Sequence, residues 1–235
     1  NYLIFFKKLM YIINMYIDFM TSNHRKTSRN YLKRVNDKKF PKYKAATLSK
    51  KWSYDYWDGD RRINYGGYHY QPGRWKRTAE RLIHHYKIKS NDNILDIGCG
   101  KGFLLYEIKL INPKINVFGF DISSYALKNA KIEIKHNLIK GCASNLPYKS
   151  KQFKLAISLN TLHCLKPSLL EKALIEISRV SKRQYICVES FRNEYEKMNL
   201  LYWQTTCEAF YSPESWKWWF RHAKYKGDHS FIYFN

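Results

Sequence analysis

Residues 94–103, ILDIGCGKGF, decide the fold, because a short apolar run leads directly into a turn that contains three glycines. The apolar run is typical of a buried parallel strand, and Phe103 begins the apolar pattern of a helix. Glycine at Gly98, Gly100 and Gly102 permits a tight turn and lets a ligand approach the backbone without meeting a Cβ atom. A dinucleotide-binding GxGxxG fingerprint needs Gly or Ala where Phe103 stands, so this turn differs from that fingerprint.

Acidic residues mark the ends of two neighbouring predicted strands. Asp96 belongs to the first strand, and Asp121 ends the next apolar run, 19 residues after Gly102. A carboxylate at the first position repels a pyrophosphate and attracts an ammonium or sulfonium group. A carboxylate at the second position accepts hydrogen bonds from both hydroxyls of a ribose. The pair predicts a site for S-adenosylmethionine, which carries both cations and no phosphate.

Strand and helix patterns alternate outward from this turn. Apolar runs predict strands at 93–98, 116–121, 137–141, 153–159, 184–190 and 231–234. Helical spacing predicts helices at 75–86, 102–111, 123–134, 167–180 and 212–223. This alternation predicts an α/β fold, with a doubly wound, Rossmann-like, mostly parallel sheet and helices on both faces. Ligands of such sheets bind beyond the carboxyl ends of the strands.

These motifs resemble the class I S-adenosylmethionine-dependent methyltransferases, close to the group called type 11. DIGCGKG at 96–102 is similar to the first motif of that family, FDIS at 120–123 to its second, and 141–165 to its adenine loop and fourth strand. The resemblance covers roughly residues 75–235. It implies a methyltransferase sheet, usually of seven strands, with an antiparallel last strand.

The resemblance also implies a set of cofactor-binding residues, in which the glycine turn follows the methionine part and Asp121 holds the ribose. The set is Asp96, Gly98, Cys99, Gly100, Gly102, Asp121, Ile122, Cys142, Ala143 and Asn160. One position departs from the family, since many relatives have an Asp that contacts the adenine amino group where this chain has Cys142, a poor acceptor. The loss of that hydrogen bond costs about 0.5–1.5 kcal/mol.

Candidate acceptor-site residues follow the fourth and fifth predicted strands. The predicted catalytic residues are Asn160, His163 and Glu189, with His163 as a general base because an unperturbed imidazole titrates near the operating pH. A packing role for His163 and an Arg partner for Glu189 are alternatives. The insert after the fifth strand adds three predicted substrate contacts, Arg192, Tyr202 and Trp203, with core packing as the alternative for the two aromatic residues.

Three regions divide the chain: a basic N-terminal arm at 1–50, a lid-like segment at 51–74 and the S-adenosylmethionine-binding domain at 75–235. For the arm, partial disorder and a mis-assigned start both stay open. The stretch YWDGDRRINYGGYHYQPGRW at 56–75 is dense in Tyr, Trp and Gly, which is typical of a lid or binding loop. We expect its centre to fold over the mouth of the cofactor site, through Tyr65, Gly66, Gly67 and Tyr68.

Composition excludes several classes of protein. With 45% hydrophobic and 26% charged residues, the chain is neither disordered throughout, nor collagen-like, nor a multi-span membrane protein. The longest uncharged stretch near its start, 9–17, is far shorter than the roughly 20 residues of a spanning helix, so no transmembrane span is expected. The 5 cysteines form no CxxC pair, which predicts free thiols, a cytoplasmic location and no metal site.

Together these observations predict a methyltransferase that acts on an oxygen or nitrogen of a small molecule, such as a sugar or a lipid-linked intermediate. An RNA methyltransferase is the first alternative, since the net charge is +23 and the aromatic residues suit stacking on bases. Against it, SLNT at 158–161 stands where amino-methylating enzymes have NPPY, and the charge is scattered along the chain. A non-catalytic binding protein with the same fold is the second alternative.

Overall fold

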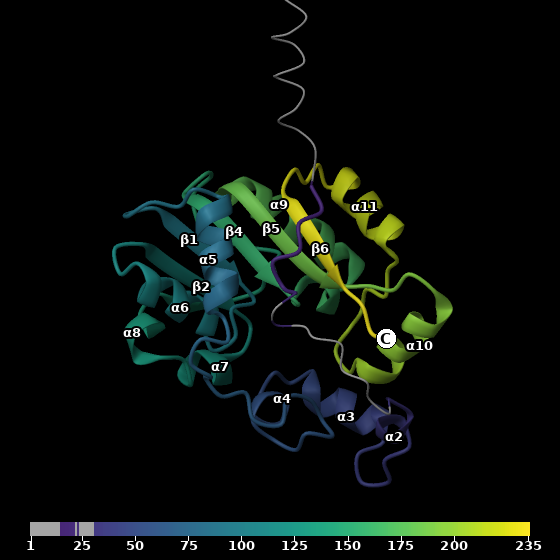
Figure 1. The fold of residues 1–235 in the computed structure, drawn as a ribbon. Coiled ribbons are helices and arrows are strands. Elements are labelled where there is room, and N and C mark those ends of the chain that lie inside the picture. The colour runs from purple at the N-terminus through teal and green to yellow at the C-terminus, as the bar shows by residue number, and fades with distance from the viewer. Residues whose placement is uncertain (1–14, 22, 24–30) are drawn as a thin grey trace, which may run out of the picture.

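The computed structural model describes residues 15–21, 23 and 31–235, in which strands and helices alternate (Figure 1). The strands are β1 (Asn93–Ile97), β2 (Asn116–Asp121), β3 (Leu138–Lys140), β4 (Phe153–Leu159), β5 (Ser181–Glu189) and β6 (Asp228–Ile232). The helices are α2 (Tyr31–Val35), α3 (Lys42–Ser49), α4 (Tyr54–Trp57), α5 (Lys76–His85), α6 (Phe103–Ile111), α7 (Ser124–Lys128), α8 (Ile132–Lys135), α9 (Pro167–Val180), α10 (Glu194–Trp203) and α11 (Pro213–His222), with a 3-10 turn η1 (Leu162–Cys164). Parts of the predicted basic arm, 1–14, 22 and 24–30, lie outside the described residues.

The six strands form one sheet in the order β3-β2-β1-β4-β5-β6. The chain moves outward from β1 to β3 and then crosses to β4 on the other side of β1. This topology confirms the predicted doubly wound sheet, and it places the switch point between β1 and β4.

The direction of the last strand differs from the prediction. β6 was expected to be antiparallel, but it pairs in parallel with β5, from Tyr185 opposite Asp228 to Glu189 opposite Ile232. The connection between the two strands contains α10 and α11, so the chain returns to the end of the sheet from which β5 started. A strand that enters from that end runs parallel to its neighbour.

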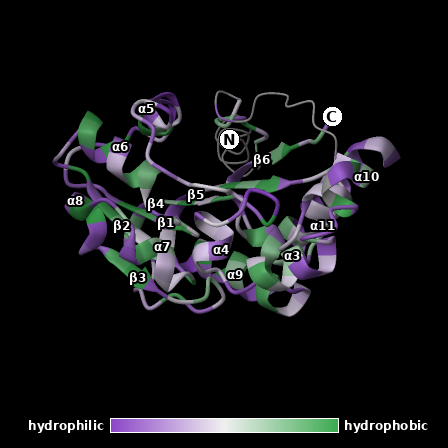
Figure 2. Ribbon diagram, turned by 90° about the horizontal axis from the view of Figure 1, so that it is seen from below, coloured by the Kyte–Doolittle hydropathy of each residue, from purple (hydrophilic) through white to green (hydrophobic). Residues whose placement is uncertain are grey.

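Apolar side chains cover both faces of the sheet. Figure 2 shows α5 and α6 on one side and α9 and α11 on the other. The α5–α6 side buries Leu82 and Ile108, and the opposite side buries Ile177 and Trp216. Because both faces are buried, strands such as β4, FKLAISL, are almost continuously apolar rather than alternating.

The region predicted as a single helix at 123–134 divides into α7 and α8. Ser123 caps α7, since its hydroxyl accepts a hydrogen bond from the Ala126 backbone N–H at 3.0 Å. Asn129 ends α7 by donating its side-chain amide to the Tyr125 carbonyl at 2.8 Å. The break lets Ala126 and Ile134 both be fully buried.

Two segments that precede β1, residues 15–17 and α2, contact the C-terminal part of the chain. Met15 and Ile17 form backbone hydrogen bonds with His229 of β6, at 3.0 and 2.9 Å. The Tyr31 ring of α2 contacts the rings of Trp203 and Phe234. Within the described ranges, no helix is both long and apolar enough to cross a membrane. The 5 cysteines are free thiols.

Candidate active site

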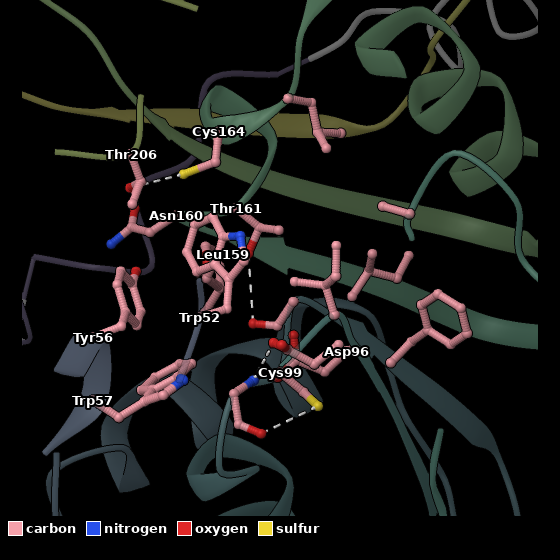
Figure 3. A pocket seen from close by; sticks show the side chains of 18 of the residues that line it. Trp52, Tyr56, Trp57, Asp96, Cys99, Leu159, Asn160, Thr161, Cys164 and Thr206 are labelled. Carbon is pink, nitrogen blue, oxygen red and sulfur yellow. Dashed lines mark hydrogen bonds between the residues drawn. The ribbon is translucent and has the colours of Figure 1, made fainter. Parts of the chain in front are cut away.

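A cavity of about 480 Å³ lies beyond the carboxyl ends of β1, β2 and β4. In Figure 3, Asp96 and Cys99 line one side of it, and Tyr56 and Trp57 line the opposite side. Its volume lies within the range of about 300–1,000 Å³ that is usual for small-molecule sites. Its position at the switch point is the one that the doubly wound sheet predicts.

The glycine turn between β1 and α6 supplies the floor of the cavity. Gly98 has a φ angle of +80°, and a Cβ atom there would lie 1.9 Å from the Thr161 hydroxyl oxygen. Gly100 has a φ angle of +56°, and its Cβ atom would lie 2.7 Å from the Trp57 ring. Glycine is therefore required at both positions, by backbone conformation and by packing.

The two predicted carboxylates lie at this floor. Asp121 accepts hydrogen bonds from the backbone N–H groups of Gly100 and Ser123, at 2.8 and 2.7 Å, so it ties the turn after β1 to the turn after β2. Burial raises the pKa of Asp121 although these two bonds oppose the shift. Burial, and then the charge of Asp121, raises the pKa of Asp96 to about 7. A positive charge in the cavity would favour the ionised form of Asp96.

The structure brings the predicted cofactor-binding residues together, apart from Gly102, which does not line the cavity. Ile122 is 47% exposed and lines the cavity, as do Cys142 and Ala143 on the turn after β3. Asn160 lines it directly after β4, and its backbone N–H donates to the Cys187 carbonyl at 2.9 Å.

Two of the predicted catalytic residues, His163 and Glu189, do not line the cavity. The side chain of His163 is 2% exposed and that of Glu189 is 7% exposed, and they contact each other with 3.5 Å between Nε2 and Oε2. Burial lowers the pKa of His163 to about 3, and burial raises the pKa of Glu189 to about 8. This burial agrees with the packing alternative for His163, because η1 turns its ring into the interior and away from the cavity. Glu189 accepts a hydrogen bond from the side-chain amide of Gln204.

The three predicted substrate contacts of the insert also lie away from the cavity. Arg192 forms an ion pair with Glu196 and covers the Tyr233 ring at 4.3 Å. Trp203 packs against α2, and Tyr202 is absent from the cavity wall. The reason is that the insert folds as α10, which packs on α2 at the outer end of the sheet.

Residues 52–68, which we call the aromatic cover, form the wall opposite the sheet. Tyr65 and Tyr68 line the cavity, while Gly66 and Gly67 form the turn that joins them. The Trp57 and Tyr65 rings are stacked, with centroids 5.4 Å apart and 5° between their planes. Three other residues of the cover line the cavity but were not among the predicted lid residues: Trp52, Tyr56 and Trp57. Their place in or near the same aromatic stretch was the available signal.

Polar and charged side chains from distant parts of the chain complete the cavity. Lys50 pairs with Glu208, and Cys164 lies 3.4 Å from the Thr206 hydroxyl. Two further exposed cations, Arg74 and Lys166, also line it. No motif in the sequence marked these residues, since they come from four separate segments.

Comparison with known proteins yields one family model, described as "Methyltransferase domain", which matches residues 88–227. An uncharacterized protein of Methanocaldococcus jannaschii is 36% identical over 123 residues, which is 52% of this chain and 46% of that protein. An uncharacterized methyltransferase of Synechocystis is 28% identical over 144 residues, covering 58% of this chain and 64% of that one. A tRNA (carboxymethyluridine(34)-5-O)-methyltransferase of Arabidopsis thaliana is 32% identical over 60% of this chain and 33% of its own length. The match thus spans between a third and two thirds of these relatives.

Solved structures share the fold. A methyltransferase of Bacillus halodurans superposes with a TM-score of 0.51 at 19% identity, over 62% of this chain and 67% of its own. The methyltransferase in the complex with the Haloferax volcanii Trm112 methyltransferase activator has a TM-score of 0.50 at 20% identity, over 65% and 72% of the two chains. At these identities the likeness concerns the fold alone.

Proposed function

Because the chain belongs to the class I S-adenosylmethionine-dependent methyltransferases, we propose that it transfers a methyl group to an oxygen or nitrogen of a small molecule. One observation carries this proposal. The cavity is lined on the sheet side by the predicted cofactor-binding residues, and on the other side by aromatic, hydroxyl and charged side chains that could contact an acceptor. The second wall contains the ring of Tyr56, the hydroxyl of Thr206 and the ion pair of Lys50 with Glu208. A cavity of this volume under an aromatic cover suits a small acceptor, and a sugar or a lipid-linked intermediate is the class we favour.

The residues on the sheet side fit S-adenosylmethionine. The main chain at Gly98 and Gly100 has no side chain that would block a ligand, and Ile122 offers an apolar surface for a base. Asp121 uses both carboxylate oxygens for backbone N–H groups, and each oxygen has a further lone pair for a ribose hydroxyl. Asp96 supplies the negative charge for a cationic group.

In this proposal, the protein accelerates methyl transfer by positioning the acceptor and by excluding water from the site. S-adenosylmethionine supplies a methyl group that is already activated on a positively charged sulfur. Among the described residues, the cavity wall contains no His. We therefore assign the rate enhancement to the cover, where Trp57, Tyr65 and Tyr68 shield the site from solvent, and to orientation of the acceptor. A general base is needed only where the acceptor is a weakly acidic hydroxyl.

RNA is the second candidate acceptor. The exposed cations Lys50, Arg74 and Lys166 line the cavity, and the net charge of the chain is +23. Relatives named as tRNA and ribosomal RNA enzymes also match the chain. A nucleotide that is flipped out of the base stack of an RNA can enter an active-site pocket, while cations beside the pocket contact the phosphates of that RNA. No observation favours a non-catalytic binding protein. We keep the cytoplasm as the proposed location.

The test uses purified protein, methyl-labelled S-adenosylmethionine and cell extract separated into RNA, lipid and small metabolites. We expect label in the small-metabolite or lipid fraction. Label in RNA alone would favour the second candidate. Binding of the cofactor without label in any fraction would favour a non-catalytic protein, and failure to bind either S-adenosylmethionine or its demethylated product would refute the proposed function.

A further inference from the structure

A buried ion pair attaches the aromatic cover to the glycine turn. The Lys101 ammonium lies 2.8 and 2.6 Å from the two carboxylate oxygens of Asp58. Their side chains are only 4% and 12% exposed. Lysine is almost never this deeply buried without a partner, so the pair indicates that Lys101 has a defined structural task inside the turn.

Asp58 connects more than two parts of the protein. It also accepts hydrogen bonds from the Tyr125 hydroxyl at 2.8 Å and from the Tyr68 backbone N–H at 2.9 Å. The carboxylate therefore connects three parts of the protein: the glycine turn through Lys101, α7 through Tyr125, and the end of the cover through Tyr68. Burial raises the pKa of Asp58, but the bonds from Lys101, Tyr125 and Tyr68 outweigh that effect and lower it, so Asp58 is ionised at neutral pH.

The neighbouring residue attaches the cover to the second cofactor loop. The Trp57 indole N–H donates to the Ser123 hydroxyl at 2.9 Å, and that hydroxyl donates to the Trp52 carbonyl. The Ser123 backbone N–H in turn donates to Asp121. Trp57 also lies against Gly100, where a Cβ atom would approach its ring to 2.7 Å. Trp57 and Asp58 thus fix the cover to the turns after β1 and β2 at the same time.

We propose that Asp58 and Lys101 are positioning residues that hold Trp57, Tyr65 and Tyr68 over the bound cofactor and slow its release. The proposal rests on the proposed function, because it assigns the cofactor to this cavity. Neither Asp58 nor Lys101 lines the cavity, so both act through the cover rather than through ligand contact.

The decisive experiment separates this role from simple stabilisation of the fold. Asp58→Asn, Lys101→Met and the double variant are compared with wild type for binding of the demethylated cofactor product by calorimetry, for its dissociation rate, and for Tm. Each single variant should raise Kd about tenfold, mainly through faster release, and lower Tm, because it leaves one buried charge unpaired. The double variant has no unpaired charge, so its Tm should recover while its Kd stays raised.

Asp60→Asn is the matched control. Asp60 belongs to the same segment and pairs with Arg62 at 2.6 Å, but the pair is more exposed and lies apart from the glycine turn. It should leave Kd and the release rate unchanged. If the double variant regains both Tm and the wild-type Kd, the ion pair is merely structural and the proposal is overturned.

A ligand-free measurement distinguishes failure of this proposal from failure of the proposed function. The backbone N–H groups of Gly67 and Tyr68 donate to the Trp57 carbonyl, both at 3.0 Å. Their hydrogen exchange should accelerate about tenfold in Lys101→Met, with β4 unaffected and Asp60→Asn like wild type. Unchanged exchange at both amides would overturn the attachment. Faster exchange in a protein whose wild type binds no cofactor would sustain the attachment and refute the proposed function.

Discussion

The two walls of the cavity are built by different means. The sheet-side wall consists of main chain and short side chains at strand ends, held by backbone hydrogen bonds such as that from the Gly141 N–H to the Asp121 carbonyl at 2.9 Å. The opposite wall consists of large aromatic side chains from a segment without strands, held by contacts such as that from Trp57 to Ser123. The sheet-side wall is tied to the sheet, whereas the cover depends on a few side-chain attachments. This difference implies that substitutions in the sheet-side wall would alter cofactor binding, whereas substitutions in the cover would alter access to the site.

A single substitution in the sheet-side wall should reduce cofactor affinity more than a single substitution in the cover. Asp121→Ala removes the proposed ribose acceptor and releases the N–H groups of Gly100 and Ser123. Because hydrogen bonds to a charged group contribute about 1.5–3 kcal/mol each, we expect the Kd for S-adenosylmethionine to rise about 100-fold or more. Calorimetry measures it. Asp92→Ala, at the opposite end of β1, is the control, and an equal effect of both changes would contradict a local role.

Asp96 should make the affinity for a cationic cofactor depend on pH. Its pKa lies near 7, so affinity should rise as pH increases from 6 to 8, by up to about tenfold per unit below the pKa. The stability of the ligand-free protein should show the opposite trend. A raised carboxyl pKa contributes stability that is present below the unfolded-state value near 3.8 and is lost as pH rises through about 7. Asp96→Asn should remove the trend in affinity and reduce the trend in stability, to which Glu189 also contributes because burial raises its pKa to about 8. An affinity profile unaltered by this change would show that Asp96 is not the group responsible.

Substitutions in the cover should have a smaller effect on cofactor affinity. Tyr65→Ala removes a ring that stacks on Trp57 and opens the mouth, so we expect the Kd for the cofactor to rise about tenfold. Tyr65→Phe keeps the ring and should bind like wild type. An unchanged Kd for the Ala variant would remove Tyr65 from the lid and confine the cover to Trp57 and Tyr68.

The smallest expected effect is an increase in the affinity for S-adenosylmethionine. Cys142→Asp would restore the acceptor that many related enzymes direct at the adenine amino group. One added hydrogen bond should lower the Kd for S-adenosylmethionine about threefold. Cys142→Ser is the control that keeps the size of the side chain. A loss of affinity in the Asp variant would mean that the adenine does not lie beside Cys142.

Sequence patterns predicted the sheet-side wall because its information is local. Asp96, Gly98 and Asp121 lie at strand ends that short apolar runs already mark, and parallel strands bring such ends to one edge. The direction of β6 was not predictable in this way, since it depends on the path of the connection that contains α10 and α11.

Side-chain direction and distant contacts limited the prediction of the catalytic residues and of the attachment of the cover. His163 and Glu189 lie close to the correct strand ends, but a turn of the chain places their side chains in the interior. The pair of Asp58 and Lys101 joins residues 43 positions apart, and no spacing rule indicates such a contact. A lysine between two glycines of a buried turn was the available signal, since a buried charge requires a partner.

The pairing of Met15 and Ile17 with His229 has a consequence for self-association. The outer rim of a sheet carries unsatisfied main-chain groups that recruit strands from other molecules. At His229 both groups are already engaged by the chain itself, at 3.0 and 2.9 Å. A short stretch from before the sheet thereby covers this edge at His229, where an added strand would otherwise pair.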